Sequence, residues 1–179
     1  MNASLPDILE GDLDIVFVGI NPGAYSAQTG HYYARPSNLF WTTLHQSGLI
    51  PQPLQPKDDW KLPRFRIGLT DIVKRSTDSS QDLSADELKT GGEIVRKKIL
   101  FYRPRTVCFN GLTAYRALFG PTEGPGAKEA RIGSSALFVV PSTSRRNARY
   151  PKEEVILWFR RLKEFIDRTS DQDRTGAVR

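Results

Sequence analysis

The sequence contains few of the residue types that build metal centres and covalent cross-links. One cysteine and two histidines among 179 residues exclude an intramolecular disulfide and a cysteine-rich zinc or iron–sulfur site. The single thiol, Cys108, lies in an apolar run and is expected to pack as a small hydrophobe. We therefore expect no metal, no cofactor and a reducing compartment, cytoplasmic or, in a eukaryote, nuclear.

Long apolar runs are also absent. The longest have the length of a strand, well short of the ~20 residues of a membrane span, and residues 1–6 lack the basic and apolar regions of a secretory signal. No membrane partner is expected. Residues 1–168 fit one compact domain, which we expect to be a monomer. Residues 169–179 are polar without periodic apolar positions, which predicts a disordered tail.

Positive charge is in excess and is concentrated in one segment. The net charge is +6 and the pI about 9.6, a balance that favours polyanionic partners. The densest part is residues 142–150, where three arginines and several hydroxyl side chains follow an apolar run: Ser142, Ser144, Arg145, Arg146 and Arg149. This pattern favours contact with nucleic acid, although a solvated loop before a helix has a similar composition.

Apolar runs and amphipathic segments alternate along the chain, which predicts an α/β fold. Strands are predicted at residues 14–20, 66–73, 105–109 and 135–141, and helices at 37–48, 84–99, 111–119 and from Pro151 to Ile166. The helix predicted at 84–99 has a capping-box pattern at its start, formed by Ser84 and Glu87. Residues 51–63 and 121–128, rich in proline and glycine, are predicted as surface loops.

The turn after the first predicted strand is the strongest functional signal. Gly19-Ile20-Asn21-Pro22-Gly23 follows a buried strand, at the edge where open α/β sheets bind ligands. The aromatic residues Tyr25, Tyr32 and Tyr33 that follow offer a flat wall suited to a nucleobase. Two alternatives exist: Asn21 could simply bond its own backbone before the proline, or the turn could bind a phosphate. The second is disfavoured because Pro22 removes an N–H donor and the Gly-x-Gly-x-x-Gly spacing is missing.

Several motifs occur in a specific order along most of the chain. The order begins with the 19–23 turn and the Gly30-His31-Tyr32-Tyr33 element. It continues with Gly91-Gly92 and Phe109-Asn110-Gly111 and ends with the Pro141–Arg146 loop. From Leu5 to Ile166 the chain resembles the mismatch-specific uracil-DNA and thymine-DNA glycosylase family. The resemblance implies a three-layer α/β/α domain with an open, mostly parallel sheet. It also implies a monofunctional enzyme of base-excision repair.

Such an enzyme binds mismatched double-stranded DNA, flips out uracil and hydrolyses its N-glycosidic bond, leaving an abasic site; thymine and modified cytosine are further candidate bases. Bond cleavage develops positive charge on the sugar and negative charge on the base. Asn21 can orient a water but cannot take its proton.

The resemblance implies that Gly19, Ile20, Ser26 and Tyr33 form the base pocket. Backbone N–H groups of Ile20 and the Tyr33 region would bind base oxygens, and Ser26 would face the pyrimidine 5-position.

Asp71 departs from the Lys or Asn that the family carries at this position. As a carboxylate it could accept a proton from water and stabilise the sugar cation, so we assign it to catalysis with Asn21. Its alternative is structural: it could cap a turn or pair with Lys74 or Arg75. No lysine is placed as an imine-forming nucleophile, and His31 is expected to be structural.

The arginine loop would supply the remaining DNA contacts. By resemblance, Arg146 is the wedge that fills the space left by the flipped base, and arginine can also bond the orphaned guanine. Arg145 replaces the small residue usual before the wedge. Arg149, Ser142 and Ser144 would contact phosphates. A non-catalytic module that binds damaged bases or nucleotides is the alternative function.

Overall fold

Five strands form one sheet in the order β2-β1-β3-β5-β4. The computed structural model describes residues 4–145 and 149–176, with side chains up to Thr169. Four strands run parallel, and the edge strand β4 is antiparallel to its neighbour β5. The strands are β1 (Ile15–Gly19), β2 (Ile67–Asp71), β3 (Thr106–Asn110), β4 (Gly126–Ile132) and β5 (Ser135–Val140).

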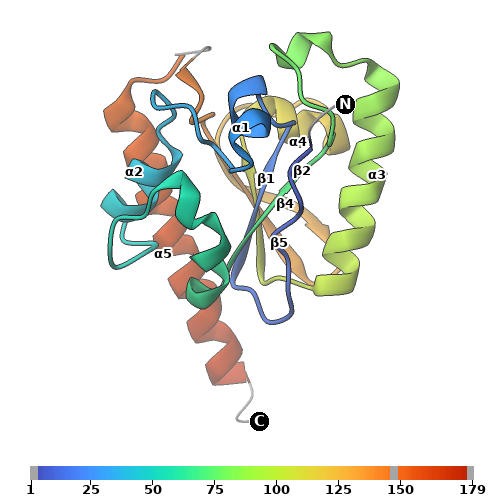
Figure 1. Cartoon of the computed structure of the whole chain (residues 1–179). Coiled ribbons are helices and arrows are strands. Elements are labelled where there is room, and N and C mark those ends of the chain that lie inside the picture. Colours follow the sequence, from blue (N-terminus) through green and yellow to red (C-terminus); the bar gives the residue numbers. More distant parts are fainter. Residues whose placement is uncertain (1–3, 146–148, 177–179) are drawn as a thin grey trace.

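Helices cover both faces of the sheet, as Figure 1 shows. α3 (Ala85–Tyr102) and α4 (Leu112–Phe119) lie on one face, and α2 (Phe40–Gln46) and α5 (Lys152–Gly176) pack on the other. Shorter elements are α1 (Ala24–Thr29) and the 3₁₀ helices η1 (Pro56–Phe65) and η2 (Ser80–Asp82). The predicted three-layer α/β/α architecture with a mostly parallel sheet is therefore confirmed.

The apolar run of β1 reflects burial on both sides of the sheet. Ile15 and Phe17 pack into the cluster beneath α2 and α5, whereas Val16 and Val18 pack into the cluster beneath α3 and α4. Successive strand residues point to opposite faces, so a strand covered on both faces is apolar throughout. The carboxyl end of β1 is thereby held inside the sheet, between β2 and β3.

The predicted capping box of α3 is present. Ser84 Oγ accepts a hydrogen bond from the Glu87 backbone N–H at 3.2 Å, and the Glu87 side chain accepts one from the Ser84 N–H at 2.9 Å. Farther along, a Cβ on Gly91 would collide with the backbone oxygen of Ile72. Glycine at this position lets α3 approach the segment after β2 closely, which brings the start of α3 beside the candidate site.

Three segments differ from the sequence-based expectation. β4 occupies part of the predicted 121–128 loop; its alternating half-buried and exposed residues fit a solvent-facing edge strand, but they lack the apolar run used to predict strands. η1 begins in the proline-rich 51–63 segment, predicted as a loop, and extends to Phe65. α5 continues to Gly176, so most of the predicted disordered tail is helical. Extending an existing helix avoids the cost of nucleation, which explains how polar residues can join it.

The strand order places the carboxyl end of β1 at a topological switch point. The connection from β1 leads to β2 on one side, whereas the connection from β2 passes through α3 to β3 on the other side of β1. Ligands bind open α/β sheets in the crevice at such a point. Asn21, two residues beyond β1, lies at this edge.

Candidate active site

The side chain of Asn21 is fixed by a segment more than fifty residues away. Its amide nitrogen donates to the backbone oxygen of Arg75 at 3.0 Å and to Thr77 Oγ1 at 2.7 Å. A backbone oxygen can only accept, so the nitrogen must face Arg75. Among the described residues, none donates a hydrogen bond to Asn21 Oδ1. The turn-forming alternative predicts that Asn21 bonds the local backbone, and only the 3.3 Å contact of its amide nitrogen with the Pro22 carbonyl oxygen fits it. The two shorter hydrogen bonds, to Arg75 and Thr77, instead fix the direction of the amide oxygen.

Asp71 ends β2 directly opposite Gly19 in the strand register. It is 3% exposed, and burial raises the pKa of its carboxyl to about 7, with smaller opposing effects of Lys74 and Asp7. Its Oδ2 has no hydrogen-bond partner within the described part of the chain. A buried, unpaired carboxyl that titrates near neutrality is typical of functional sites.

The predicted alternative pairing of Asp71 is wrong. Lys74 pairs with Asp7, and the Arg75 guanidinium binds Glu87 through two hydrogen bonds of 2.8 and 3.0 Å. Two cationic residues therefore follow Asp71 closely in the sequence, and neither of them is its ion-pair partner.

Gly19, Asp71 and Tyr33 meet at one point beneath the turn. A Cβ on Gly19 would collide with Asp71 Oδ1 and would lie 3.2 Å from the Tyr33 hydroxyl oxygen. That hydroxyl is buried close to the Asn110 side chain. Burial, followed by the negative charge of Asp71, raises the pKa of Tyr33 and outweighs the lowering by Asn110, so the phenol stays protonated and can donate a hydrogen bond.

The Tyr33 ring is held in a strained but well-anchored turn. Its φ of 52° lies in the left-handed region that side chains rarely adopt. On one side the Tyr32 N–H donates to Asp59 Oδ2 at 3.1 Å, and on the other the Ala34 N–H donates to Ser26 Oγ at 3.0 Å. The ring stacks on Phe40 with centroids 4.1 Å apart. Such strain at an anchored turn is typical of ligand-binding positions.

The side chains of Ser26 and His31 both make contacts that support the turn around Tyr33, a role predicted for His31 but not for Ser26. The hydroxyl of Ser26 is committed to the Ala34 N–H, so Ser26 supports the Tyr33 turn. His31 Nδ1 lies 3.2 Å from Asp59 Oδ2, which agrees with the structural role predicted for this histidine. Asp59 thereby joins η1 to the turn.

Two backbone donors remain available at the edge of the sheet. Within the described residues, neither the Ile20 N–H nor the Tyr33 N–H donates a hydrogen bond. The Ile20 position is nevertheless fixed, because the Val73 N–H donates to its carbonyl oxygen at 2.8 Å. These are the two backbone donors predicted to bind base oxygens, and preorganised N–H groups of this kind stabilise developing negative charge.

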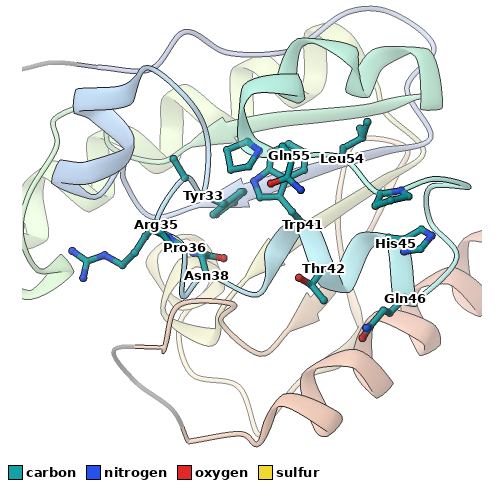
Figure 2. Close-up of a pocket in the computed structure, with 13 residues that line it drawn as sticks. Tyr33, Arg35, Pro36, Asn38, Trp41, Thr42, His45, Gln46, Leu54 and Gln55 are labelled. Carbon is teal, nitrogen blue, oxygen red and sulfur yellow. The ribbon is translucent and has the colours of Figure 1, made fainter.

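A cavity of about 410 Å³ opens beside Tyr33. Figure 2 shows Arg35 and Asn38 at one end of it and His45 and Gln46, from α2, at the other. Of the predicted base-pocket residues, only Tyr33 lines this cavity; Gly19, Ile20 and Ser26 do not. Tyr33 therefore belongs both to the buried cluster with Asp71 and to the wall of an open cavity.

The loop after β5 is fixed to the same edge of the sheet by Asn110. Its amide donates to Thr143 Oγ1 at 2.9 Å and accepts from the Thr143 N–H at 3.0 Å. Arg145 and Arg149 extend from this loop and are exposed. Ser142 Oγ accepts from the Ser144 N–H at 3.3 Å. Arg146, the predicted wedge, lies outside the described residues.

Sequence reasoning missed two residues that shape the site. Thr77 accepts from Asn21 and donates to the Ser79 carbonyl oxygen at 2.7 Å; nothing in a single sequence marks this role. Asn110 was noted only as part of a matching motif, yet its position at the end of a predicted strand could have marked it. Both are buried polar residues.

The residues that the structure describes form neither a metal centre nor a membrane-spanning helix. No group of three or more His, Cys, Asp or Glu side chains is arranged there to hold a metal ion. No helix in that part of the chain combines the length and hydropathy needed to cross a membrane.

Comparisons with known proteins agree with the fold and identify a superfamily. The fold matches a candidate uracil DNA glycosylase from Methanosarcina acetivorans, solved in solution by NMR, with a TM-score of 0.62 and 24% sequence identity over 90% of this chain and 98% of that chain. At this identity the match supports the fold alone. A model of the uracil DNA glycosylase superfamily matches residues 6–165. The chain therefore belongs to the uracil DNA glycosylase superfamily.

Proposed function

We propose that this protein is a monofunctional, mismatch-specific DNA glycosylase of the uracil-DNA and thymine-DNA type. It would hydrolyse the N-glycosidic bond of a flipped uracil in mismatched duplex DNA and leave an abasic site for base-excision repair. The observation that carries the proposal is the amide of Asn21, whose nitrogen is held by Arg75 and Thr77 so that Oδ1 is left to accept from a water. Superfamily membership supports the reaction class.

Asn21 and Asp71 have complementary roles in this proposal. Asn21 Oδ1 orients the attacking water but, as a neutral amide, cannot take its proton. The ionised Asp71 carboxylate would take that proton and stabilise the positive charge on the sugar. A carboxyl whose pKa is about 7 is well matched to a base that acts near neutral pH.

The base would bind against Tyr33. The ring supplies a flat wall, and the unused N–H groups of Ile20 and Tyr33 would receive the base oxygens as negative charge develops. Gly19 keeps the floor open, because a side chain there would displace the Asp71 carboxyl. Ser26, small and close to the turn, would leave room at the pyrimidine 5-position. A mismatch lowers the cost of extrusion, which adds selectivity.

The arginine loop would bind the DNA around the flipped base. Arg149, Ser142 and Ser144 would contact phosphates, and Arg145 with Arg146 would occupy the duplex beside the orphaned base. Lys74, the lysine nearest Asp71 in sequence, already donates to the Leu5 carbonyl and to the Tyr32 hydroxyl and pairs with Asp7. It is therefore not placed as an amine nucleophile, which supports a monofunctional reaction.

A panel of duplexes tests the proposal. Wild type, Asn21→Ala and Asp71→Ala are incubated with duplexes that vary the target base and its opposite partner, and alkali then cleaves any abasic site. Wild type should yield alkali-dependent cleavage of G·U, Asn21→Ala should be slowed by about 100-fold or more, and Asp71→Ala should also be slowed. Tight binding to G·U by wild type without product would instead support a non-catalytic damaged-base module. Full activity of Asp71→Ala would remove Asp71 from catalysis.

The pH dependence gives a separate prediction. Since the ionised form of Asp71 is the active one, the rate of base release should rise with pH and level off above about 7, following the pKa of this carboxyl. Single-turnover rates between pH 5 and 9 measure it. In Asp71→Asn this rise should vanish; a wild-type profile that is flat over the range would contradict the assignment.

A further inference from the structure

The N-terminal strap, residues 5–9, runs beside the edge strand β2. Ile8 and Leu69 form an antiparallel bridge in which each backbone N–H donates to the other's carbonyl oxygen at 2.9 Å. This bridge attaches the strap to β2 at Leu69, two residues before Asp71. It also places Asp7 next to the two lysines that influence the Asp71 carboxyl.

Asp7 is the centre of a cluster of three donors. Its carboxylate pairs with the Lys74 ammonium, pairs with Lys98 Nζ at 2.5 Å and accepts from Thr70 Oγ1 at 2.7 Å. Burial alone would raise the pKa of Asp7, but the hydrogen bonds from Lys74, Lys98 and Thr70 outweigh it and lower that pKa. Asp7 is therefore a fixed negative charge at neutral pH.

All three N–H donors of Lys74 are occupied. One goes to Asp7, one to the Leu5 carbonyl oxygen at 3.0 Å and one to the Tyr32 hydroxyl at 3.2 Å. An ammonium group has three donors, so none is left for Asp71, which precedes Lys74 by three residues. Two of the three acceptors, Leu5 and Asp7, belong to the N-terminal strap.

We propose that Asp7 is a positioning residue for the active site: together with the rest of the N-terminal strap it holds the Lys74 ammonium away from Asp71, whose carboxyl stays unpaired for the substrate. This inference rests on the proposed function for the role of Asp71. The holding of Lys74 itself follows from the hydrogen bonds above.

The charges around Asp71 give the direction of the expected change. The groups that face it are Lys74 after β2, Lys98 on α3, Asp7 on the strap, and the phenols of Tyr32 and Tyr33. After burial, which raises the pKa of Asp71, Lys74 and Lys98 lower it and Asp7 raises it. Without Asp7, both ammonium groups lose their counter-ion, and Lys74 can turn to the unpaired carboxyl. An opposite charge in contact lowers a carboxyl pKa.

Two readouts on the full-length protein test the inference. Carboxyl ¹³C NMR follows the titration midpoint of Asp71, assigned with Asp71→Asn, and single-turnover base release from a G·U duplex gives the pH profile. In Asp7→Asn both midpoints should fall by at least one pH unit. Asp14→Asn is the matched control, since Asp14 also binds two cations, Arg66 and Arg105, and should leave both midpoints unchanged.

A second variant separates the holding of Lys74 from the charge of Asp7 itself. In Asp7→Asn/Lys74→Met both members of the pair are removed, so the midpoint should return to within about half a unit of wild type. The inference is overturned if Asp7→Asn leaves the midpoints unmoved, or if the double variant falls by a pH unit or more. If Asp7→Asn alone does not fold, the double variant still tests the inference, because a fall of a pH unit or more in it would overturn it.

The outcome is distinguishable from failure of the proposed function. If the NMR midpoint shifts as expected while wild type releases no base, the positioning of Lys74 stands and the glycosylase proposal fails. If wild type releases base while neither midpoint moves in Asp7→Asn, only the inference about Asp7 fails.

Discussion

At the scale of single residues, the site consists of polar groups whose environment is set by burial. Asn21 and Asp71 could be chosen from sequence because Asn21 follows one predicted strand and Asp71 lies near the carboxyl end of another, at the ligand-binding edge of an α/β sheet. Their surroundings could not be predicted: the contacts of Asn21 with Arg75 and Thr77 span more than fifty residues, and the unpaired state of Asp71 depends on a strap from the start of the chain. Such long-range contacts leave no periodic signal.

Asp71 should reduce the stability of the protein as the pH rises. Its pKa is about 7 in the folded protein against an ordinary 3.8, so between these values the unfolded chain binds fewer protons and the free energy of unfolding falls with pH. The loss should reach up to about 4 kcal/mol, since a pKa difference of one corresponds to about 1.4 kcal/mol. Urea denaturation between pH 4 and 8 measures it.

Asp71→Asn is the comparison for that experiment. The isosteric amide cannot ionise, so this variant should be more stable than wild type at pH 8 and should lose the fall between pH 4 and 7. Equal pH dependence of the two proteins would contradict the assignment of a buried, unpaired carboxyl to this position.

At the scale of elements, the site is assembled from the ends of strands and the first turn of a helix. The buried strands and the capped start of α3 could be predicted because their apolar runs and caps are local signals. β4 and η1 could not, since an exposed edge strand and a proline-rich helix lack those signals. The structure adds that Glu87, in the first turn of α3, holds Arg75, whose carbonyl oxygen orients Asn21.

Glu87→Gln tests this connection between α3 and Asn21. Glutamine preserves the capping box but removes the charge that binds Arg75, so the loop carrying the Arg75 carbonyl should become less well fixed. We expect base release to slow by about 10-fold with little change in the melting temperature, because exposed ion pairs add little stability. Asp167→Asn, which breaks the exposed Lys163–Asp167 pair on α5, is the matched control; equal rates for both variants would argue against the connection.

At the scale of the whole molecule, a net charge of +6 and the arginine loop at the sheet edge fit a protein that binds DNA across the carboxyl ends of its strands. Asn110 fixes that loop through Thr143, and the Leu39 N–H donates to the Thr143 carbonyl oxygen at 3.0 Å. These hydrogen bonds join Thr143, near the start of the arginine loop, to the end of β3 and to the residue before α2.

The salt dependence of DNA binding tests the role of the arginine loop. If Arg149 neutralises one phosphate, Arg149→Ala should reduce the slope of log K against log salt by about 1, to a similar extent for G·U and fully paired duplexes. Fluorescence anisotropy between 50 and 300 mM salt measures the slope. Arg161→Ala is the control, since that guanidinium lies over the Trp158 ring on α5, 4.5 Å from its centroid; a slope unchanged by Arg149→Ala would remove this residue from the DNA interface.

The most direct measurement is a crystal structure of Asn21→Ala bound to a duplex with one G·U mismatch, because this variant should bind the substrate without cleaving it. We expect an intact uracil nucleotide extruded from the duplex, with its ring against Tyr33 and its oxygens near the Ile20 and Tyr33 N–H groups. A uracil that remains stacked in the duplex, or one bound away from the carboxyl end of β1, would contradict this expectation.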